Sequence, residues 1–248
     1  MDNRNKFGLI GKNISYSFSR KYFKEKFQKL GLNKCKYDNY DIPEIEEFPF
    51  ITYQQEDDFQ GFSVTIPYKQ SIIKYLDEVE GDAKEIGAVN TIKVTSNNKL
   101  IGYNTDVYGF KKSIEHLLKK HHSKALILGT GGASKAVAYA LEKLKIQYQF
   151  VSRNVSDNSL LYSILDQQII EEHTVIINCT PLGTHPNIDS SPNIPYQFIT
   201  DKHLLFDLIY NPSETKFLHE GKKRGAAIKN GLEMLEMQAE KSWEIWNS

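Results

Sequence analysis

The residues Leu126-Ile127-Leu128-Gly129-Thr130-Gly131-Gly132-Ala133-Ser134-Lys135-Ala136 form an apolar run, a glycine-rich turn and the start of a helix. Glycines lack the Cβ atoms that would keep a backbone away from a pyrophosphate, and the free amides of the helix would face that anion. Ser134 stands where the usual spacing has a third Gly or Ala, so a plain structural turn is the alternative. The flanking strand and helix favour a dinucleotide-binding turn. Its expected cofactor contacts are Gly129, Gly131, Gly132 and Ala133.

The second half of the chain continues this pattern of strand and helix. A helix is expected over residues 134–144, and further apolar strands over 148–151, 175–178 and 204–209. Continuous apolar strands joined by helices are typical of a parallel sheet covered on both faces. The sequence therefore predicts a C-terminal Rossmann-like domain with a doubly wound parallel sheet.

The first half indicates a second, smaller α/β domain. Strand-like runs at 7–10, 37–40 and 61–65 alternate with helical stretches at 22–30 and 70–75. The runs 88–94 and 100–102 flank the polar turn Ser96-Asn97-Asn98 and predict a hairpin, so this sheet is expected to be mixed. We place the N-terminal domain at residues 1–106 and the Rossmann-like domain, with a linker helix over 107–120, at residues 107–231. A last helix at 232–248 is expected to rejoin the first domain.

Composition excludes several classes of function. The 248 residues are 40% hydrophobic and 25% charged, with 31 Lys+Arg against 31 Asp+Glu, which is typical of a globular protein and gives no net attraction to nucleic acid or anionic membranes. No apolar run approaches the ~18 residues of a membrane span, and the polar N-terminus argues against a signal peptide. The two cysteines, Cys35 and Cys179, are too few for a disulfide framework or a cysteine-rich zinc site, and they favour a reducing, cytoplasmic location. His121 and His122 are interpreted as a basic helix end rather than a metal site.

The end of the second strand of the dinucleotide domain indicates which cofactor is bound. There, Ser152-Arg153-Asn154 contains no acid before Asp157. An acid at this place accepts a hydrogen bond from the ribose of NAD, whereas a guanidinium pairs with the 2′-phosphate of NADP. The sequence favours NADP(H), although an Arg153 that is only a surface charge would leave the choice open.

Polar residues near strand ends in the first half are candidates for chemistry. Ser17 and Ser19 belong to an alternating segment that could receive a carboxylate, with an N-cap at Ser19 as the alternative. Lys69 follows a strand that ends at Thr65, and Asp106 follows another. Asp106 alone could cap a helix that starts at Val107. Together, an ammonium and a carboxylate projected from neighbouring strand ends could share a proton.

Two strand exits and the last helix complete the candidate list in the second half. The segments Asn178-Cys179-Thr180-Pro181-Leu182-Gly183 and Asp207-Leu208-Ile209-Tyr210-Asn211-Pro212 leave strands where backbone could touch a flat ring. Gly231 opens the last helix at a point where backbone could come close to a ligand. Gln238 is equally well explained as a packing residue or as a ligand contact.

Taken together, these segments resemble the shikimate dehydrogenase family from Phe7 to Gln238. The family's hydroxyl pair is similar to Ser17 and Ser19. The remaining matching motifs, in chain order, are Val64-Thr65-Ile66-Pro67-Tyr68-Lys69, residues 88–91, residues 102–106, the glycine turn, the two strand exits and the segment from Gly231 to Gln238. The sequence departs from the family pattern at Asn13, Arg20, Ser63, Ser152 and Thr184, of which Ser63 replaces a usual Asn. None of these departures removes a catalytic group.

The resemblance implies reversible NADPH-dependent reduction of 3-dehydroshikimate to shikimate, a step of chorismate and aromatic amino acid biosynthesis. It implies Lys69 and Asp106 as catalytic residues. The substrate residues it implies are Ser17, Ser19, Thr65, Asn90, Tyr210 and Gln238. The further cofactor residues are Ser152, Arg153, Asn154, Thr180, Leu208 and Gly231. The expected partner is a small molecule, with no metal, and the chain is expected to be a monomer or homodimer. The alternatives are a quinate/shikimate dehydrogenase that uses NAD and a non-catalytic dinucleotide-binding sensor.

Overall fold

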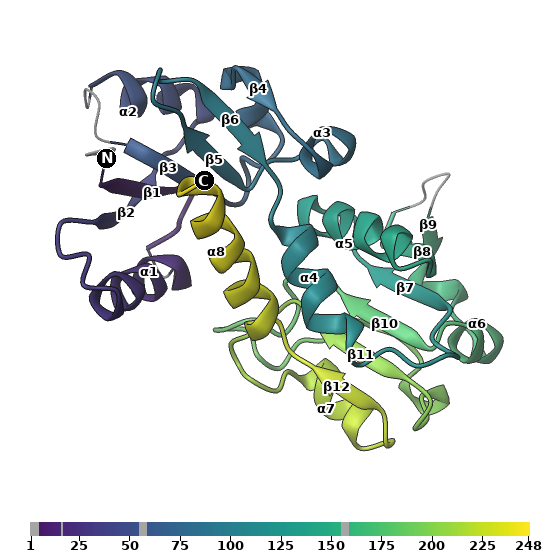
Figure 1. The fold of residues 1–248 in the computed structure, drawn as a ribbon. Coiled ribbons are helices and arrows are strands. Elements are labelled where there is room, and N and C mark those ends of the chain that lie inside the picture. Colours follow the sequence, from purple (N-terminus) through teal and green to yellow (C-terminus); the bar gives the residue numbers. More distant parts are fainter. Residues whose placement is uncertain (1–4, 16, 55–58, 155–158) are drawn as a thin grey trace. The chain divides into compact units, whose positions relative to one another are not determined.

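The computed structural model describes residues 5–15, 17–54, 59–154 and 159–248, which form two α/β units (Figure 1). The first unit contains residues 1–105 and 239–248, and the second contains residues 106–238. The first boundary lies one residue earlier than the sequence predicts. The last helix, α8 (Leu232–Trp246), belongs to the second unit up to residue 238 and to the first unit from residue 239.

The first unit is built on a mixed six-stranded sheet, as the sequence predicts. Its strand order is β2-β1-β3-β5-β6-β4, in which β1 runs parallel to β2 and β3, whereas β5 is antiparallel to β3 and β6. The strands are β1 (Lys6–Gly11), β2 (Lys36–Asp41), β3 (Phe59–Val64), β4 (Glu78–Val79), β5 (Thr91–Val94) and β6 (Leu100–Tyr103).

Helices cover both faces of this sheet because alternate strand residues are apolar on both sides. On one face, Phe7 packs against Phe27 of α1 (Phe18–Lys29) and Trp246 of α8. On the other face, Phe62 packs against Phe48 at the start of α2 (Phe48–Gln54). A short α3 (Asp82–Ile86) precedes β5.

The second unit is a fully parallel six-stranded sheet, which confirms the doubly wound prediction. Its order is β12-β11-β10-β7-β8-β9. The strands are β7 (Lys124–Leu128), β8 (Gln147–Ser152), β9 (Ser159–Leu161), β10 (Val175–Asn178), β11 (Leu204–Asp207) and β12 (Ala227–Lys229). The central strands β7, β10 and β11 are buried on both faces, which explains their unbroken apolar sequences.

Helices lie on both faces of the second sheet. Phe110 of α4 (Asp106–Glu115) meets Phe206 of β11 with ring centroids 5.0 Å apart, and α5 (Gly132–Lys143) lies beside α4 (Figure 1). On the opposite face, α6 (Gln167–Glu172) and α7 (Lys216–Lys222) pack on the side chains of Leu126 and Ile176.

Differences from the expected elements fall where local signals are weak. The sequence missed β4, β9 and β12, which have only two or three residues each and lie at sheet edges. The linker helix expected over 107–120 begins at Asp106 and ends at Glu115, and the helical stretch at 70–75 is a 3-10 helix, Ser71–Tyr75. His121 and His122 both contact the carbonyl oxygen of Lys202, and the described residues contain no cluster suited to a metal ion.

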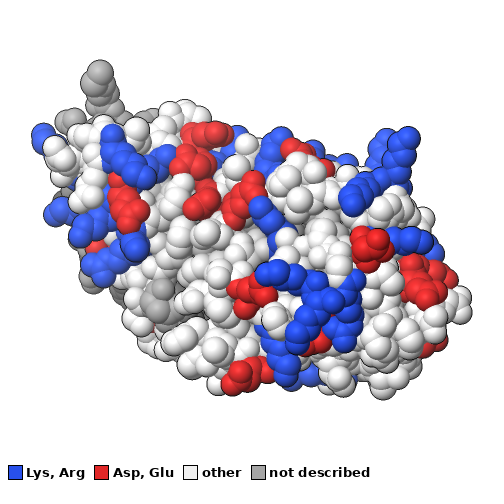
Figure 2. Space-filling model, turned by 90° about the horizontal axis from the view of Figure 1, so that it is seen from below, with Lys and Arg blue, Asp and Glu red and all other residues white. Residues whose placement is uncertain are grey.

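The surface agrees with the zero net charge. Figure 2 shows Lys and Arg side chains next to Asp and Glu side chains on the same face. Within the described residues, no helix has the length and apolar character that crossing a bilayer requires.

Candidate active site and dinucleotide cradle

Four segments of the first unit meet at one edge of its sheet. Strands β1 and β3 end there, at Gly11 and Val64. The antiparallel β5 begins at this edge with Thr91, and β6 ends there with Tyr103. We call this the carboxyl edge of the first sheet. Loops that leave the same edge of a sheet are brought together by topology alone.

The loop after β3 carries Thr65 and Lys69, both half-buried. The backbone N–H of Thr65 donates to the carbonyl of Ile10 at 2.9 Å, and the carbonyl of Lys69 accepts from the N–H of Val89 at 2.7 Å. Between them, the Tyr68 hydroxyl donates to the Ile42 carbonyl at 2.7 Å. Because the loop is fixed at these points, the Lys69 side chain starts from a rigid backbone.

A buried network of hydroxyls and one amide fixes the residue before Asp106. The Asn90 side chain accepts from the N–H of Thr105 at 2.7 Å and donates to the Thr105 hydroxyl at 2.9 Å. Ser242 of α8 lies 2.7 Å from the Thr91 hydroxyl and 3.1 Å from that of Thr105. Asn90, predicted to contact substrate, therefore also has a structural role that the sequence did not reveal.

Asp106 is the first residue of α4 and only 7% exposed. The expectation that it could cap a helix starting at Val107 is wrong, because the helix includes Asp106. A carboxylate in the first turn is stabilised by the helix dipole. Since Asp106 follows Thr105 directly, the network that fixes Thr105 also limits where the Asp106 backbone can lie.

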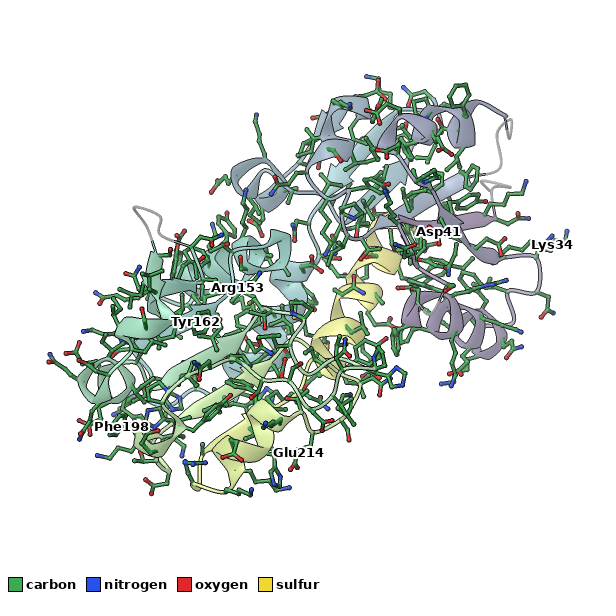
Figure 3. All side chains as sticks on the ribbon, turned by 180° about the vertical axis from the view of Figure 1, so that it is seen from behind. Lys34, Asp41, Arg153, Tyr162, Phe198 and Glu214 are labelled. Carbon is green, nitrogen blue, oxygen red and sulfur yellow. The ribbon has the colours of Figure 1, made fainter. Side chains whose placement is uncertain are left out.

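Ser17 and Ser19 lie at the N-terminus of α1, not in an extended segment. Ser17 is the N-cap and its hydroxyl accepts from the N–H of Ser19 at 3.2 Å, so the alternative interpretation of Ser19 as the N-cap is wrong. The helix therefore begins two residues earlier than expected, and Tyr16 lies outside the described residues. Asp41, labelled in Figure 3, holds the preceding loop by accepting from the N–H groups of Asn13 and Ile14 at 2.8 and 3.1 Å.

The glycine turn of the second unit leaves open backbone at the start of α5. Gly129 has a φ of +101°, which favours glycine, and a Cβ there would lie 3.0 Å from Thr180. Gly131 and Gly132 differ, because a Cβ at either would meet no atom within 4 Å. Packing therefore does not require these two glycines. A 12-residue helix with no acid in its first turn is suited to an anion at this point.

The end of β8 presents a cation beside this turn. Ser152 is the last residue of β8, and its hydroxyl accepts from the N–H of Asn154 at 3.2 Å. Arg153 is exposed at the strand end (Figure 3). Burial raises the pKa of Tyr162 to about 12, and the positive charge of Arg153 partly offsets that rise. The first acid after β8 in the sequence is Asp157. It falls within residues 155–158, which lie outside the described residues.

The exits of β10 and β11 are tied together by buried side chains. Asp207 accepts from the Asn178 amide at 3.0 Å, the Ile209 N–H at 3.0 Å and the Thr215 hydroxyl at 2.6 Å. Burial raises the pKa of this carboxyl from 3.8 to about 6, and the three hydrogen bonds limit the rise. Thr180 donates to the Asn178 side chain at 2.7 Å. Thr180 is thus held in place beside Gly129.

Gly231 has a packing role that the sequence analysis did not anticipate. A Cβ at Gly231 would lie 2.1 Å from the carbonyl oxygen of Leu208, so only glycine fits at this close backbone approach. The N–H of Gly231 also donates to the carbonyl of Ile209 at 3.0 Å. The glycine is explained without a ligand, although it fixes the position of Leu208.

The remaining predicted substrate residues belong to the second unit. Tyr210 is half-buried in the exit of β11. The Gln238 amide donates to the carbonyl of Leu235 at 2.9 Å, and its backbone lies against Gly109 of α4, one turn from Asp106. Ser17, Ser19, Thr65, Lys69 and Asn90 lie in the first unit, whereas Asp106, Tyr210, Gln238 and the predicted cofactor residues lie in the second.

Several structurally important residues were missed as site residues. Thr91, Thr105 and Ser242 are fully or almost fully buried polar residues, as are Asn178 and Asp207. Thr91, Thr105, Asn178 and Asp207 stand inside the quoted motifs. Their position next to predicted site residues was the sequence feature that could have indicated their role. Ser242 gave no such signal, because its partners lie 137 and 151 residues away.

Comparison with known proteins agrees with this geometry. A family model described as the shikimate dehydrogenase substrate binding domain matches residues 9–92. The chain is 40% identical to shikimate dehydrogenase (NADP(+)) of Methanococcus maripaludis, across 96% of this chain and 90% of that protein. The structure of shikimate dehydrogenase from Aquifex aeolicus matches with a TM-score of 0.86 and 34% identity, covering 98% of this chain and 92% of that one. The structure of shikimate 5-dehydrogenase from Thermus thermophilus in complex with NADP(H) and shikimate matches with a TM-score of 0.83 and 28% identity, covering 98% and 93%.

Proposed function

The chain belongs to the shikimate dehydrogenase family, and we propose that it catalyses the reversible reduction of 3-dehydroshikimate to shikimate with NADPH. This reaction is a step of chorismate and aromatic amino acid biosynthesis. The observation that carries the proposal is the carboxyl edge of the first sheet, where Thr65, Lys69 and Asn90 share one edge and the chain continues directly to Asp106. The second unit adds a cradle for a dinucleotide.

Proton transfer is assigned to Lys69. NADPH, when bound, supplies the hydride that is added to the carbonyl carbon. Lys69, as the ammonium, donates a proton to the carbonyl oxygen, so that the ketone gains one hydride and one proton and becomes an alcohol. In the reverse direction Lys69 accepts the proton of the alcohol. Asp106 orients the ammonium, and positioned acid-base groups of this kind contribute about 10²- to 10⁴-fold in rate.

The substrate is a small carboxylic acid with ring hydroxyls, which matches the polar groups of the site. Ser17 and Ser19, with Tyr210, are proposed to bind the carboxylate, and the N-terminus of α1 has no acid in its first turn to repel it. Thr65, Asn90, Asp106 and Gln238 are proposed to bind the ring hydroxyls. Hydroxyl, amide and carboxylate groups together can donate to and accept from a polyol.

The cofactor contacts are assigned to the second unit. The N–H groups near Gly131, Gly132 and Ala133 are proposed to hold the pyrophosphate, because open backbone and a free helix N-terminus coincide there. Ser152, Arg153 and Asn154 are proposed to bind the adenosine 2′-phosphate, with the guanidinium making the selective contact. Thr180 and the backbone of Leu208 and Gly231 are proposed to lie along the cofactor.

The decisive experiment follows absorbance at the NADPH band with shikimate as substrate. We expect turnover with NADP+ and shikimate, and much lower kcat/KM with NAD+ or with quinate. Equal or higher kcat/KM with NAD+ and quinate would assign the chain to the quinate/shikimate type. Binding of NADPH without turnover of either acid would identify a non-catalytic sensor.

The location and assembly of the protein are proposed on less specific grounds. Both cysteines are free and separate, which suits a reducing compartment, so we propose that the enzyme works in the cytoplasm. We propose a monomer or a homodimer in solution. Light scattering coupled to size-exclusion chromatography distinguishes the two, and a larger assembly would contradict both.

A further inference from the structure

A buried serine of the last helix lies among hydroxyls of the first unit and is not used in the proposed function. Ser242 of α8 is fully buried, and it belongs to the first unit together with the rest of residues 239–248. Serine in the interior of a helix is less favourable than alanine, and a buried hydroxyl costs free energy unless it is hydrogen-bonded. Helix stability alone would therefore favour alanine at this position, so the hydroxyl needs another explanation.

Three hydroxyls from three separate segments form a triangle that includes Ser242. The Ser242 Oγ lies 2.7 Å from the Oγ1 of Thr91, which begins β5, and 3.1 Å from the Oγ1 of Thr105, which follows β6. The two threonine oxygens are 3.2 Å apart. Because a hydroxyl can both donate and accept, hydroxyls that meet in this way can satisfy one another, and linked hydrogen bonds strengthen each other. Ser242 thus joins α8 to two segments at the carboxyl edge of the first sheet.

The next turn of α8 fixes the direction in which Ser242 points. Trp246 lies one helical turn after Ser242, is 2% exposed, and donates from its Nε1 to the carbonyl of Ile92 at 3.0 Å. Ile92 follows Thr91 directly in β5, so successive turns of the helix contact successive residues of the strand. A Cβ at Gly61 would clash with the Trp246 indole, so this glycine lets the ring come close. The helix cannot rotate about its axis without breaking these contacts, and the Ser242 hydroxyl is therefore held in one place.

Thr105 connects the triangle to the proposed catalytic residues. The side chain of Asn90 also binds the N–H and the hydroxyl of Thr105, so Thr105 is held both by α8 and by the residue that precedes β5. Asp106 follows Thr105 directly and is the first residue of α4. A displacement of about 1 Å in an active site can lower the rate by about 10²-fold. The Ser242 hydroxyl is thus one of the groups that determine where Asp106 lies.

We propose that Ser242 is a positioning residue for the proposed reaction, whose hydroxyl holds Thr105 and, through Thr105, the start of α4 with Asp106. The inference rests on the proposed function, in which Asp106 orients the ammonium of Lys69. Ser242 acts through its two neighbours along this path and needs no contact with substrate or cofactor. Its effect should therefore appear in the rate of the reaction rather than in the binding of the cofactor.

The variant Ser242→Ala tests this role, because it removes one oxygen and keeps a good helix former. We expect kcat for shikimate oxidation to fall about tenfold, since Asp106 is no longer held in the geometry that the transition state requires. The KM for NADP+ should stay the same, because the proposed cofactor residues all belong to the second unit. Steady-state kinetics and the melting temperature of the same preparation are the measurements. A melting temperature that falls while kcat is unchanged would show a purely structural role and overturn the proposal.

Ser113→Ala is the matched control for loss of a buried helix hydroxyl. Ser113 of α4 is also fully buried, and its hydroxyl donates to the carbonyl of Phe110 at 3.0 Å, within the same helix. This variant makes the same chemical change outside the triangle, so its kcat should match that of the wild type. An equal loss of kcat in Ser113→Ala and Ser242→Ala would show a general effect of the lost hydroxyl and would contradict the positioning role.

A double-mutant cycle with Asp106→Ala shows whether Ser242 acts through Asp106. If it does, Ser242→Ala should lower the residual kcat of the Asp106→Ala variant by less than about twofold, because the group being positioned is already absent. A further tenfold loss in that background would show independent effects and overturn the proposal. If the wild-type protein oxidises shikimate with neither NADP+ nor NAD+, the proposed function fails and this inference fails with it. If the wild type turns over and Ser242→Ala retains its kcat, only the inference fails.

Discussion

Lys69 gains its proposed role from the fixed backbone that carries its side chain. Hydrogen bonds at Thr65, Tyr68 and the Lys69 carbonyl fix the loop, so the ammonium can be directed without rearranging the chain. In such a site, the free energy of activation depends on a proton donor beside the carbonyl oxygen of the substrate rather than on the net charge of the site.

Replacing Lys69 by Ala should therefore lower kcat by about 10²- to 10⁴-fold, because the carbonyl oxygen loses its proton donor in the transition state. The KM for NADP+ should change little. Steady-state kinetics with purified protein measures both. Lys84→Ala, at an exposed lysine of α3, is the control. A Lys69→Ala variant that retains near wild-type kcat would remove Lys69 from the mechanism.

Arg153 should determine the choice of cofactor. The variant Arg153→Ala is expected to weaken NADPH by about tenfold or more and NADH hardly at all, because only NADPH carries the 2′-phosphate that a guanidinium can bind with two hydrogen bonds. Fluorescence titration of both cofactors measures this, with Lys120→Ala as the exposed-cation control. Equal losses for the two cofactors would show that Arg153 does not recognise the phosphate.

Asp207 predicts a defined pH dependence of stability. Its pKa is raised by burial from 3.8 to about 6, so the folded protein holds this proton more tightly than the unfolded chain. Stability contributed by this group is present at about pH 4 and is lost as pH rises through about 6. The loss amounts to up to about 3 kcal/mol.

The variant Asp207→Asn should remove this contribution. From pH 4 to pH 7 the wild type should lose up to about 3 kcal/mol of unfolding free energy through Asp207, and the variant should not lose it. Urea unfolding at a series of pH values measures the difference. Asp201→Asn, at an exposed carboxylate, serves as control. A difference that does not vary with pH would contradict the raised pKa.

At the scale of elements, glycines of two kinds occur at the N-termini of helices in the second unit. Gly231 precedes α8 and is required because the Leu208 carbonyl would lie 2.1 Å from a Cβ. Gly132 begins α5, and a Cβ at Gly132 would meet no atom within 4 Å. The first glycine is explained by packing within the protein and the second by room for a ligand.

The two glycines should therefore respond in opposite ways to the same substitution. Gly231→Ala should lower the free energy of unfolding by about 1–3 kcal/mol, since backbone must move. Gly132→Ala should leave stability unchanged or slightly higher, because alanine favours the helix, and should weaken NADPH binding. Thermal unfolding and cofactor titration of both variants decide. Unchanged NADPH affinity in Gly132→Ala would argue against the pyrophosphate site.

At the scale of the whole molecule, the two units contribute different groups to the proposed reaction. The first unit contains the proposed proton donor and hydroxyl groups, and the second contains Asp106 and the proposed dinucleotide cradle. A hydride moves only between atoms in near contact, so turnover requires both units. The proposed cofactor residues all belong to the second unit, whereas the proposed substrate residues come from both.

Hydrogen exchange should show this division. NADP+ alone should slow exchange at residues 129–134 and 152–154, and shikimate alone should slow it at residues 63–69, because bound ligand stabilises the state that binds it. Mass spectrometry of peptides from these segments gives the measurement, and β2 peptides serve as an internal reference for NADP+. Protection of residues 63–69 by NADP+ alone, with no effect at 129–134, would reverse the assignment.

The sequence alone predicted the mixed and the parallel sheet, the glycine turn and the order of the family's motifs. The two sheets and the turn depend on hydrophobic periodicity and on glycine chemistry, which act between residues close along the chain, whereas the motif order rests on the resemblance to the family. The sequence also predicted the last helix, expected at 232–248 and found as α8 at Leu232–Trp246, because its apolar spacing is helical throughout.

The tertiary structure decided what each polar residue contacts. It moved the N-cap from Ser19 to Ser17, gave Gly231 a packing role, and joined Thr105 to Ser242 across 137 residues. It also left the Tyr37 hydroxyl buried without a partner of normal geometry in the described part of the chain. Such contacts depend on which distant strands and helices become neighbours, and no pattern within a short stretch of sequence shows which these are.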